Sequence, residues 1–200
     1  VDDGAIRTLE AREYLSPLMT KRAGYGGPSR GEDDGSSAFQ PAIVMMDLPR
    51  AEGILPEDSV RVAAFAKPWK RIIASSSPGG DGYAARALIE RPAKIGRLTA
   101  PLFPTVTGRL DYSSVIEARF AFGDLSSVTK QSLFSGDNRL AVKAQNGQFE
   151  IIGFRSAEEV EPGLWHLSEL LRGLYGTEPE MMAGAINDAD VVLLDSAVTS

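Results

Sequence analysis

The chain has 200 residues and is acidic, with a net charge of −6 and no cysteine. This length suits one or two domains with a hydrophobic core, and the lack of cysteine excludes disulfides, thiolate metal sites and a cysteine nucleophile. The acidic balance argues against a nucleic-acid partner, and no run of about 18 apolar residues is present that could span a membrane.

The chain begins with Val1 rather than methionine, so we expect it to be a piece of a longer protein. Residues 5–14 (AIRTLEAREY) suit a short strand or a helical turn, and we favour the strand. The glycine- and serine-rich stretch that follows has too little apolar surface to offset the entropy of ordering. The predicted organisation is the end of a preceding module at 1–15, a flexible linker at 16–39, a β subdomain at 40–105 and a second β subdomain at 106–200.

Short apolar or alternating segments, separated by Pro and Gly, predict the strands of the first β subdomain. The segments 71–74 and 83–90 are expected to form a hairpin around a loop that contains Ser75, Ser76 and Ser77. The predicted strands are 42–48 (AIVMMDL), 59–66 (SVRVAAFA), 71–74, 83–90 (YAARALIE) and 95–102 (IGRLTAPL).

The clearest strand of the chain is 114–122 (SVIEARFAF), which opens the second β subdomain. Its alternation places Ile116, Ala118, Phe120 and Phe122 on one face.

A short helix is predicted at 125–134, with Asp124 as its N-cap and Gly136 at its end. Further on, 178–182 is expected to be a helical turn and 191–194 the last strand.

The stretch 147–177 predicts a hairpin. It consists of a strand at 149–154, a polar and acidic connection at 155–163 and a return strand at 164–172. A strand at 140–144 precedes it, and the turn between them carries Asn146 and Gly147. That dipeptide favours a type I′ turn because both residues tolerate positive φ.

Together these features predict a mainly β protein with one or two short helices. About ten short strands are more than an open sheet easily holds, so the sheet is expected to curl into a barrel or split into a sandwich.

His166 is the only histidine, so a Ser–His–Asp triad or a zinc site would have to use it. Zinc sites take several His or Cys ligands, and we interpret His166 as a partly buried or surface residue of a strand. Ser75, Ser76 and Ser77 lack the Gly-x-Ser-x-Gly spacing of a nucleophile and suit a hairpin loop. We therefore predict no catalytic residue, no cofactor site and no metal ligand, and a protein that is not an enzyme.

Carboxylates offer two other candidate groups. Paired carboxylates can hydrolyse glycosides, and loops that wrap an ion with oxygens can bind calcium. Neither group has the calcium-loop pattern, so we interpret both as solvated charge and leave calcium as an open alternative. The groups are Glu158, Glu159 and Glu161 in the hairpin connection and Asp188, Asp190 and Asp195 late in the chain.

Four aromatic residues, Trp69, Tyr83, Trp165 and Tyr175, could line a sugar-binding platform. On amphipathic strands, however, aromatic side chains are more often core or interface anchors. We expect Trp165 to be a packing anchor.

The segments 149–155 (FEIIGFR), 163–168 (GLWHLS) and 170–177 (LLRGLYGT) resemble a signature of phage tail-tip and baseplate hub proteins. This family includes the large tail protein of gene transfer agents and related siphophages, which carries the signature near its C-terminus. Looser similarities cover 6–14, 44–49 (VMMDLP), 83–96 and 123–128 (GDLSSV), so the resemblance extends over nearly the whole chain. The family often has Gln or Ala after LLRG, where this chain has Leu174 and Tyr175.

The resemblance implies a structural module of a tail tip or baseplate that assembles with other tail proteins, as a homotrimer in the full-length assembly. The module would be part of the virion tail and be assembled in the bacterial cytoplasm. Full-length relatives also resemble glycoside hydrolases in an upstream region without counterpart here, so no catalytic residue is carried over. The alternative function is a carbohydrate-binding module that recognises a glycan of the host surface.

Overall fold

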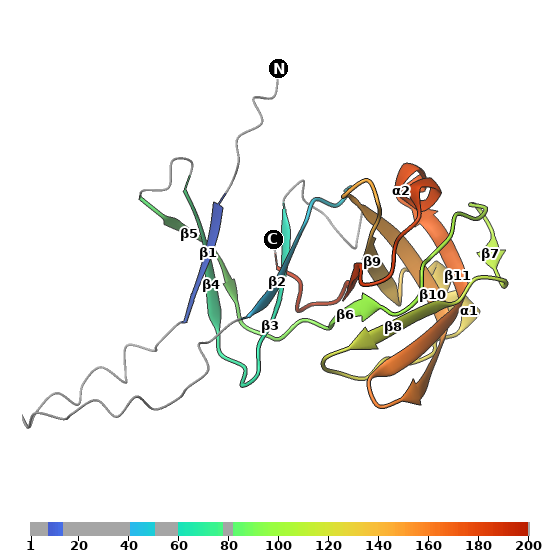
Figure 1. Ribbon diagram of the computed structural model, residues 1–200, viewed down its shortest axis with the longest axis horizontal. Helices are drawn as coiled ribbons and strands as arrows, with labels where there is room; N and C mark the ends of the chain where they lie inside the picture. The colour runs from blue at the N-terminus through green and yellow to red at the C-terminus, as the bar shows by residue number, and fades with distance from the viewer. Residues whose placement is uncertain (1–7, 14–40, 51–59, 78–81, 200) are drawn as a thin grey trace, which may run out of the picture.

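The computed structural model describes residues 8–13, 41–50, 60–77 and 82–199. Over these residues the chain is mainly β, with twelve strands and two short helices, which confirms the predicted fold class. A closed barrel occupies one end of the molecule, and smaller sheets lie beside it (Figure 1).

The barrel has six antiparallel strands. They run in the order β10-β9-β12-β6-β8-β11, and β11 pairs again with β10, which closes the ring. Closure satisfies the edges that an open sheet would expose, and it decides between the predicted barrel and sandwich in favour of the barrel. The strands are β6 (Ile95–Leu98), β8 (Ile116–Phe120), β9 (Arg139–Lys143), β10 (Phe149–Glu161), β11 (Leu164–Leu174) and β12 (Asp190–Leu193).

The alternation predicted for β8 fills the barrel interior. Ile116, Ala118 and Phe120 are buried in one core cluster, and Trp165 of β11 joins them there at 6% exposure. The predicted packing role of Trp165 is therefore confirmed. Phe122 was expected on the same face but is 44% exposed, because β8 ends at Phe120 and Phe122 stacks outside on Phe65.

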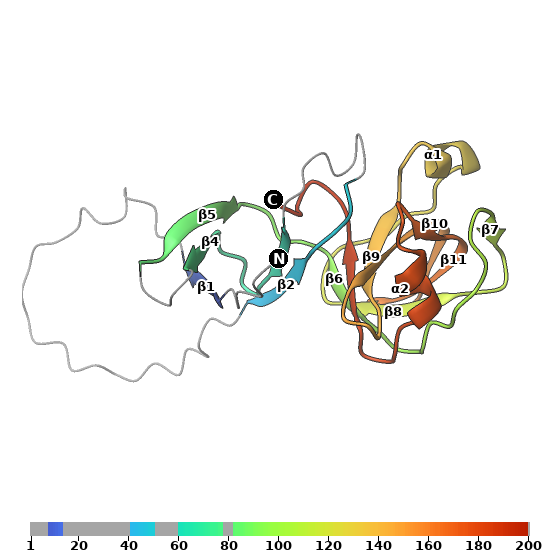
Figure 2. The same ribbon diagram turned by 90° about the horizontal axis from the view of Figure 1, so that it is seen from above.

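A two-stranded hairpin of β2 (Ala42–Met46) and β3 (Arg61–Phe65) lies between the barrel and the third sheet (Figures 1 and 2). One face of the hairpin, with Val44 and Ala63, packs on the outside of the barrel. The other face, with Val62 and Ala64, packs on β4. Burial on both faces explains why β3 is mostly apolar, whereas Ala42 and Met45 of β2 are exposed.

The third sheet has the order β1-β4-β5 and contains β1 (Thr8–Glu13), β4 (Ile72–Ser77) and β5 (Ala84–Ile89). It confirms the strand expected within 5–14 and the expected hairpin. The placement of Ser75, Ser76 and Ser77 in the hairpin loop is wrong, since all three belong to β4. Ser75 and Ser76 pair with strands on both sides, which extends the ladder beyond the apolar run.

The largest correction concerns the segment 155–163. It was expected to be a polar connection, but β10 continues to Glu161 and pairs with β11 through Glu158↔His166 and Glu159↔Trp165. Only Pro162 and Gly163 form the turn. Gly163 has a φ of +76°, and a Cβ there would lie 2.9 Å from the Phe120 carbonyl oxygen, so this turn requires glycine. The outer half of β10 is polar because it is exposed.

The predicted helix 125–134 is also wrong in extent, since α1 spans only Lys130–Phe134. Its N-cap is Thr129 and not the predicted Asp124. The Thr129 side chain accepts a hydrogen bond from Ser132 N. The residues before it follow β10 instead: Val128 N donates to Arg155 O at 2.8 Å. Backbone pairing with a strand outweighs the local helix signal here.

The turn before β10 differs from the expected type I′. Gly147 has a φ of +88°, but Asn146 does not have a positive φ. Ala144 N donates to Gln148 O at 2.8 Å, which closes a three-residue loop with glycine in the left-handed position.

The helix α2 (Glu178–Ala183) and β12 confirm the two elements expected near the end of the chain. The barrel takes in β6, so its strands come from both sides of residue 105, where the sequence predicts a subdomain boundary. The division into domains stays a prediction, and the expected linker at 16–39 lies outside the described residues. Within the described ranges no helix is long and apolar enough to cross a membrane.

Candidate interaction surface

The predicted site residues do not form a catalytic arrangement. His166 lies half-exposed on β11, as expected, and its Nε2 is 3.2 Å from Glu117 Oε2 of β8. The Thr99 hydroxyl also donates to Glu117. This hydrogen bond, together with His166, holds the pKa of Glu117 below its ordinary value. Ser75, Ser76 and Ser77 lie on a different sheet from His166.

Several carboxylates of the two groups contact nearby protein groups. Glu161 pairs with Arg119 at 3.2 Å, and Asp190 pairs with Arg97 at 3.2 Å. Glu159 accepts a hydrogen bond from the Gly163 backbone at 2.7 Å. Across the described ranges, no cluster of three or more His, Cys, Asp or Glu residues could hold a metal ion.

The four aromatic residues do not gather into one platform. Trp165 is buried in the barrel core, whereas Trp69 packs against the cluster formed by β3, β4 and β5. Tyr83 and Tyr175 are each 36% exposed and lie beside β5 and at the end of β11.

A buried ion pair joins two of the segments that carry the resemblance, 149–155 and 170–177. Arg172 Nε donates to Glu150 Oε1 at 2.7 Å, and Arg172 Nη2 donates to Glu150 Oε2 at 2.9 Å. The two residues are 1% and 2% exposed. Gly173 N adds a third hydrogen bond to Glu150 at 2.9 Å, and Arg172 Nη1 reaches the Phe103 carbonyl at 3.3 Å. This buried ion pair therefore ties β10, β11 and the segment at Phe103 together.

Two further residues of the segment 170–177, Gly173 and Thr177, are also determined by their contacts. Gly173 has a φ of +60°, and a Cβ there would lie 3.0 Å from Thr107 Cγ2 and 3.2 Å from Glu178 Cα. Thr177 is 3% exposed; its hydroxyl accepts from Ile151 N at 3.0 Å and donates to Leu174 O at 2.7 Å. None of the roles of Glu150, Arg172, Gly173 and Thr177 was predicted, although a glutamate and an arginine inside apolar strands signal a buried ion pair.

Thr177→Val should lower the free energy of unfolding by about 1–3 kcal/mol, because it leaves the buried Ile151 N–H without its acceptor while keeping the side-chain shape. Urea denaturation measures the change. Thr107→Val, at an exposed threonine, is the control and should change stability by less than about 0.5 kcal/mol. Equal effects of the two substitutions would contradict the assignment.

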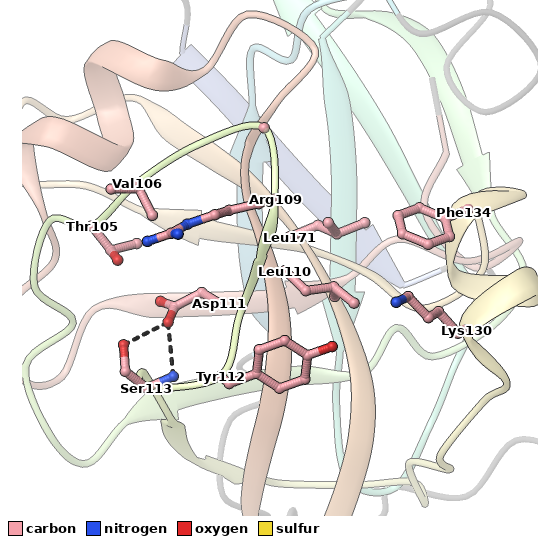
Figure 3. A pocket seen from close by; sticks show the side chains of 11 residues that line it. Thr105, Val106, Arg109, Leu110, Asp111, Tyr112, Ser113, Lys130, Phe134 and Leu171 are labelled. Atoms are coloured by element: carbon pink, nitrogen blue, oxygen red, sulfur yellow. Dashed lines mark hydrogen bonds between the residues drawn. The ribbon is translucent and has the colours of Figure 1, made fainter.

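A groove of about 630 Å³ opens between the short strand β7 (Leu110–Asp111) and α1. We call it the β7–α1 groove. Its lining comes from the segment 105–113, from Lys130 and Phe134 of α1, and from Leu171 of β11. In Figure 3, Lys130 extends from α1 toward Leu110, and the side chains of Arg109 and Tyr112 lie on either side of Leu110. The groove is thus apolar at its base, with cationic groups along its sides.

Asp111 fixes the shape of the loop at one wall of the groove. Its Oδ1 accepts hydrogen bonds from Ser113 Oγ at 2.6 Å, Ser113 N at 2.8 Å and Ser114 N at 3.2 Å. Burial raises the pKa of Asp111, but the hydrogen bonds from Ser113 and Ser114 outweigh it and hold the pKa well below its ordinary value of 3.8. Its Oδ2 is buried and has no hydrogen-bond partner among the described residues.

The depressed pKa makes Asp111 a source of acid sensitivity. The folded protein holds the ionised form more strongly than the unfolded chain, so the stabilisation is complete above pH 5 and is lost as pH falls below about 4. Asp111→Asn should therefore destabilise the protein more at pH 7 than at pH 3, in denaturant titrations at both values. An equal effect at the two pH values would show that the charge of Asp111 is not what stabilises the loop.

Apolar side chains of the groove are exposed to solvent. The five most exposed large hydrophobic side chains of the described residues all belong to the barrel half of the chain. They are Phe103 (72%), Tyr112 (67%), Met182 (61%), Ile186 (59%) and Phe134 (58%). Two of the five, Tyr112 and Phe134, line the groove, and exposed apolar side chains that share one groove mark a candidate interaction surface.

Comparison with known proteins identifies the family of the chain. A search of curated proteins finds no match. A protein-family model described as "Rcc01698-like, C-terminal" matches residues 93–192, which is half of the chain. The matched range contains five barrel strands, all but the last residue of β12, both helices, the buried ion pair and the groove. The chain belongs to the Rcc01698-like, C-terminal family.

Proposed function

We propose that this chain is a structural module of the tail tip or baseplate of a phage or gene-transfer-agent particle. The observation that carries the proposal is the family match over 93–192. The same region contains the LLRGLYGT segment, through which the chain resembles tail-tip proteins. The proposed role is assembly with other tail subunits, in the particle tail after assembly in the bacterial cytoplasm, with a homotrimer in the full-length protein.

The chemistry of the surface supports a binding role. Exposed Phe103, Tyr112 and Phe134 would bury apolar area on contact with another subunit, worth roughly 25 cal/mol per Å² before the costs of association. Three of the charged residues singled out in the sequence, Glu161, His166 and Asp190, pair with other side chains of the chain. We accordingly propose a non-enzymatic role.

Particle composition tests this proposal. An epitope tag on the protein that carries this chain should copurify with particles, and immunogold electron microscopy should label one end of the tail. A tag on an abundant cytoplasmic protein is the control for trapped material. A tagged protein that is absent from particles in which other tail proteins are detected would refute the proposal.

The rival proposal is a carbohydrate-binding module for host-surface glycans. The exposed ring of Tyr112, next to the polar groups of Arg109 and Asp111, is the observation in its favour, since sugars stack on exposed aromatic faces. A glycan array with the 200-residue chain separates the two. A defined hit that is lost in a folded Tyr112→Ala variant would favour the glycan.

A further inference from the structure

We propose that the β7–α1 groove binds an extended, acidic peptide segment of a neighbouring protein, with one apolar side chain of that segment inserted at its base. The inference deepens the proposed function, because it names the chemistry of the partner. It rests on that function only for the identity of the neighbour, since peptide binding can be measured without particles.

The base of the groove fits an apolar side chain. Leu110 and Leu171, paired across β7 and β11, form it, and the exposed side chains of Val106, Tyr112 and Phe134 line the groove beside them. Their exposure is 45%, 67% and 58%, so an inserted side chain would cover surface that is now in water. A volume of about 630 Å³ holds several side chains and is far larger than a packing defect.

The charges of the groove favour acidic flanks. Its ionisable cations are Arg109 and Lys130, which are both exposed, and Lys130 Nζ lies 5.9 Å above the Phe134 ring. Its one carboxylate, Asp111, already accepts three hydrogen bonds from Ser113 and Ser114. A protein with a net charge of −6 thus presents a locally cationic groove, which suits a negatively charged partner.

The backbone arrangement favours an extended peptide. β7 is the terminal strand of its sheet and pairs only with β11, so its other edge has no strand partner in the described part of the chain. Sheet edges of this kind bind extended peptides through main-chain hydrogen bonds.

A peptide array with the labelled 200-residue chain tests the inference. The probes are immobilised hexapeptides with one central Phe or Leu, in three sets whose flanks are Asp/Glu, Lys/Arg or Ser/Gly. The acidic set should retain the chain and the basic set should not. Retention of none of the sets, or equal retention of the acidic and basic sets, would overturn the proposal.

Variants then place the binding in the groove. For the best acidic peptide, fluorescence anisotropy should show an affinity loss of about tenfold or more in the double variant Arg109→Glu with Lys130→Glu. Lys143→Glu, at an exposed lysine of β9 that does not line the groove, makes one such charge reversal outside the groove and should leave the affinity within about twofold. The single variant Lys130→Glu, with the same change in net charge, should weaken binding more than Lys143→Glu does. Circular dichroism confirms that the variants fold.

The outcomes separate this inference from the function it rests on. Equal affinity of the double variant and Lys143→Glu would show that the peptide binds elsewhere and would overturn the inference. A glycan hit that depends on Tyr112, without acidic peptide binding, would also overturn it. Peptide binding that depends on Arg109 and Lys130, in a protein absent from tails, would support the groove and refute only the tail-tip role.

Discussion

Arg172→Met is expected to lower the free energy of unfolding by about 3–5 kcal/mol. The substitution removes a guanidinium that is 1% exposed and leaves the Glu150 carboxylate buried without its bidentate partner. Burying an unpaired charge in the barrel core costs far more free energy than the ion pair contributes. The loss of stability therefore comes mainly from the Glu150 carboxylate that is left without a partner. Equilibrium unfolding in urea, followed by tryptophan fluorescence, measures the change.

Two variants show whether the pairing is the cause. Arg119→Met removes the arginine of the exposed pair with Glu161, whose side chains are 50% and 63% exposed, and should cost less than about 1 kcal/mol. The double variant Arg172→Met with Glu150→Leu removes both buried charges and should recover a large part of the loss. If Arg172→Met and Arg119→Met had the same effect, the buried ion pair would not be a stabilising connection between β10 and β11.

Trp165→Ala is expected to cost about 3–5 kcal/mol, because it leaves a large cavity between β8, β10 and β11. Trp165 is 6% exposed and belongs to the main core cluster of the barrel. The matched change is Trp69→Ala, at a tryptophan only partly buried beside β4 and β5, which should cost clearly less. Differential scanning calorimetry compares the two. A larger loss at Trp69 would contradict the assignment of Trp165 as the packing anchor.

The buried ion pair and the groove are connected by contacts of the segment before β7. Arg172 bonds the Phe103 carbonyl at 3.3 Å, and Gly173 leaves room for Thr107, so the segment before β7 is held against the end of β11. β7 itself pairs with β11 at Leu110↔Leu171. The LLRGLYGT segment therefore has a physical role beyond closing the barrel, since it fixes one wall of the β7–α1 groove.

The sequence by itself determined the fold class and most of the strands. Alternation in 114–122 placed Ile116, Ala118 and Phe120 inward, and the apolar context of Trp165 indicated a core residue; both are confirmed. These features depend on local periodicity, which a strand with one buried face imposes directly on its sequence. The Rcc01698-like, C-terminal family model matches 93–192, which contains the segments 149–155, 163–168 and 170–177, whereas the looser similarities at 6–14 and 44–49 lie outside the match.

Only the tertiary structure decided what depends on contacts between distant residues. The polar segment 155–161 is a strand because β11 pairs with it, although local composition favoured a connection. Residues 126–128 are not helical, although a helix was predicted there, and Ser127 and Val128 are hydrogen-bonded to β10. The Glu150–Arg172 pair joins residues 22 positions apart, and the β7–α1 groove joins the segment 105–113, α1 and Leu171. Barrel closure sets these juxtapositions, and no local pattern of residues encodes them.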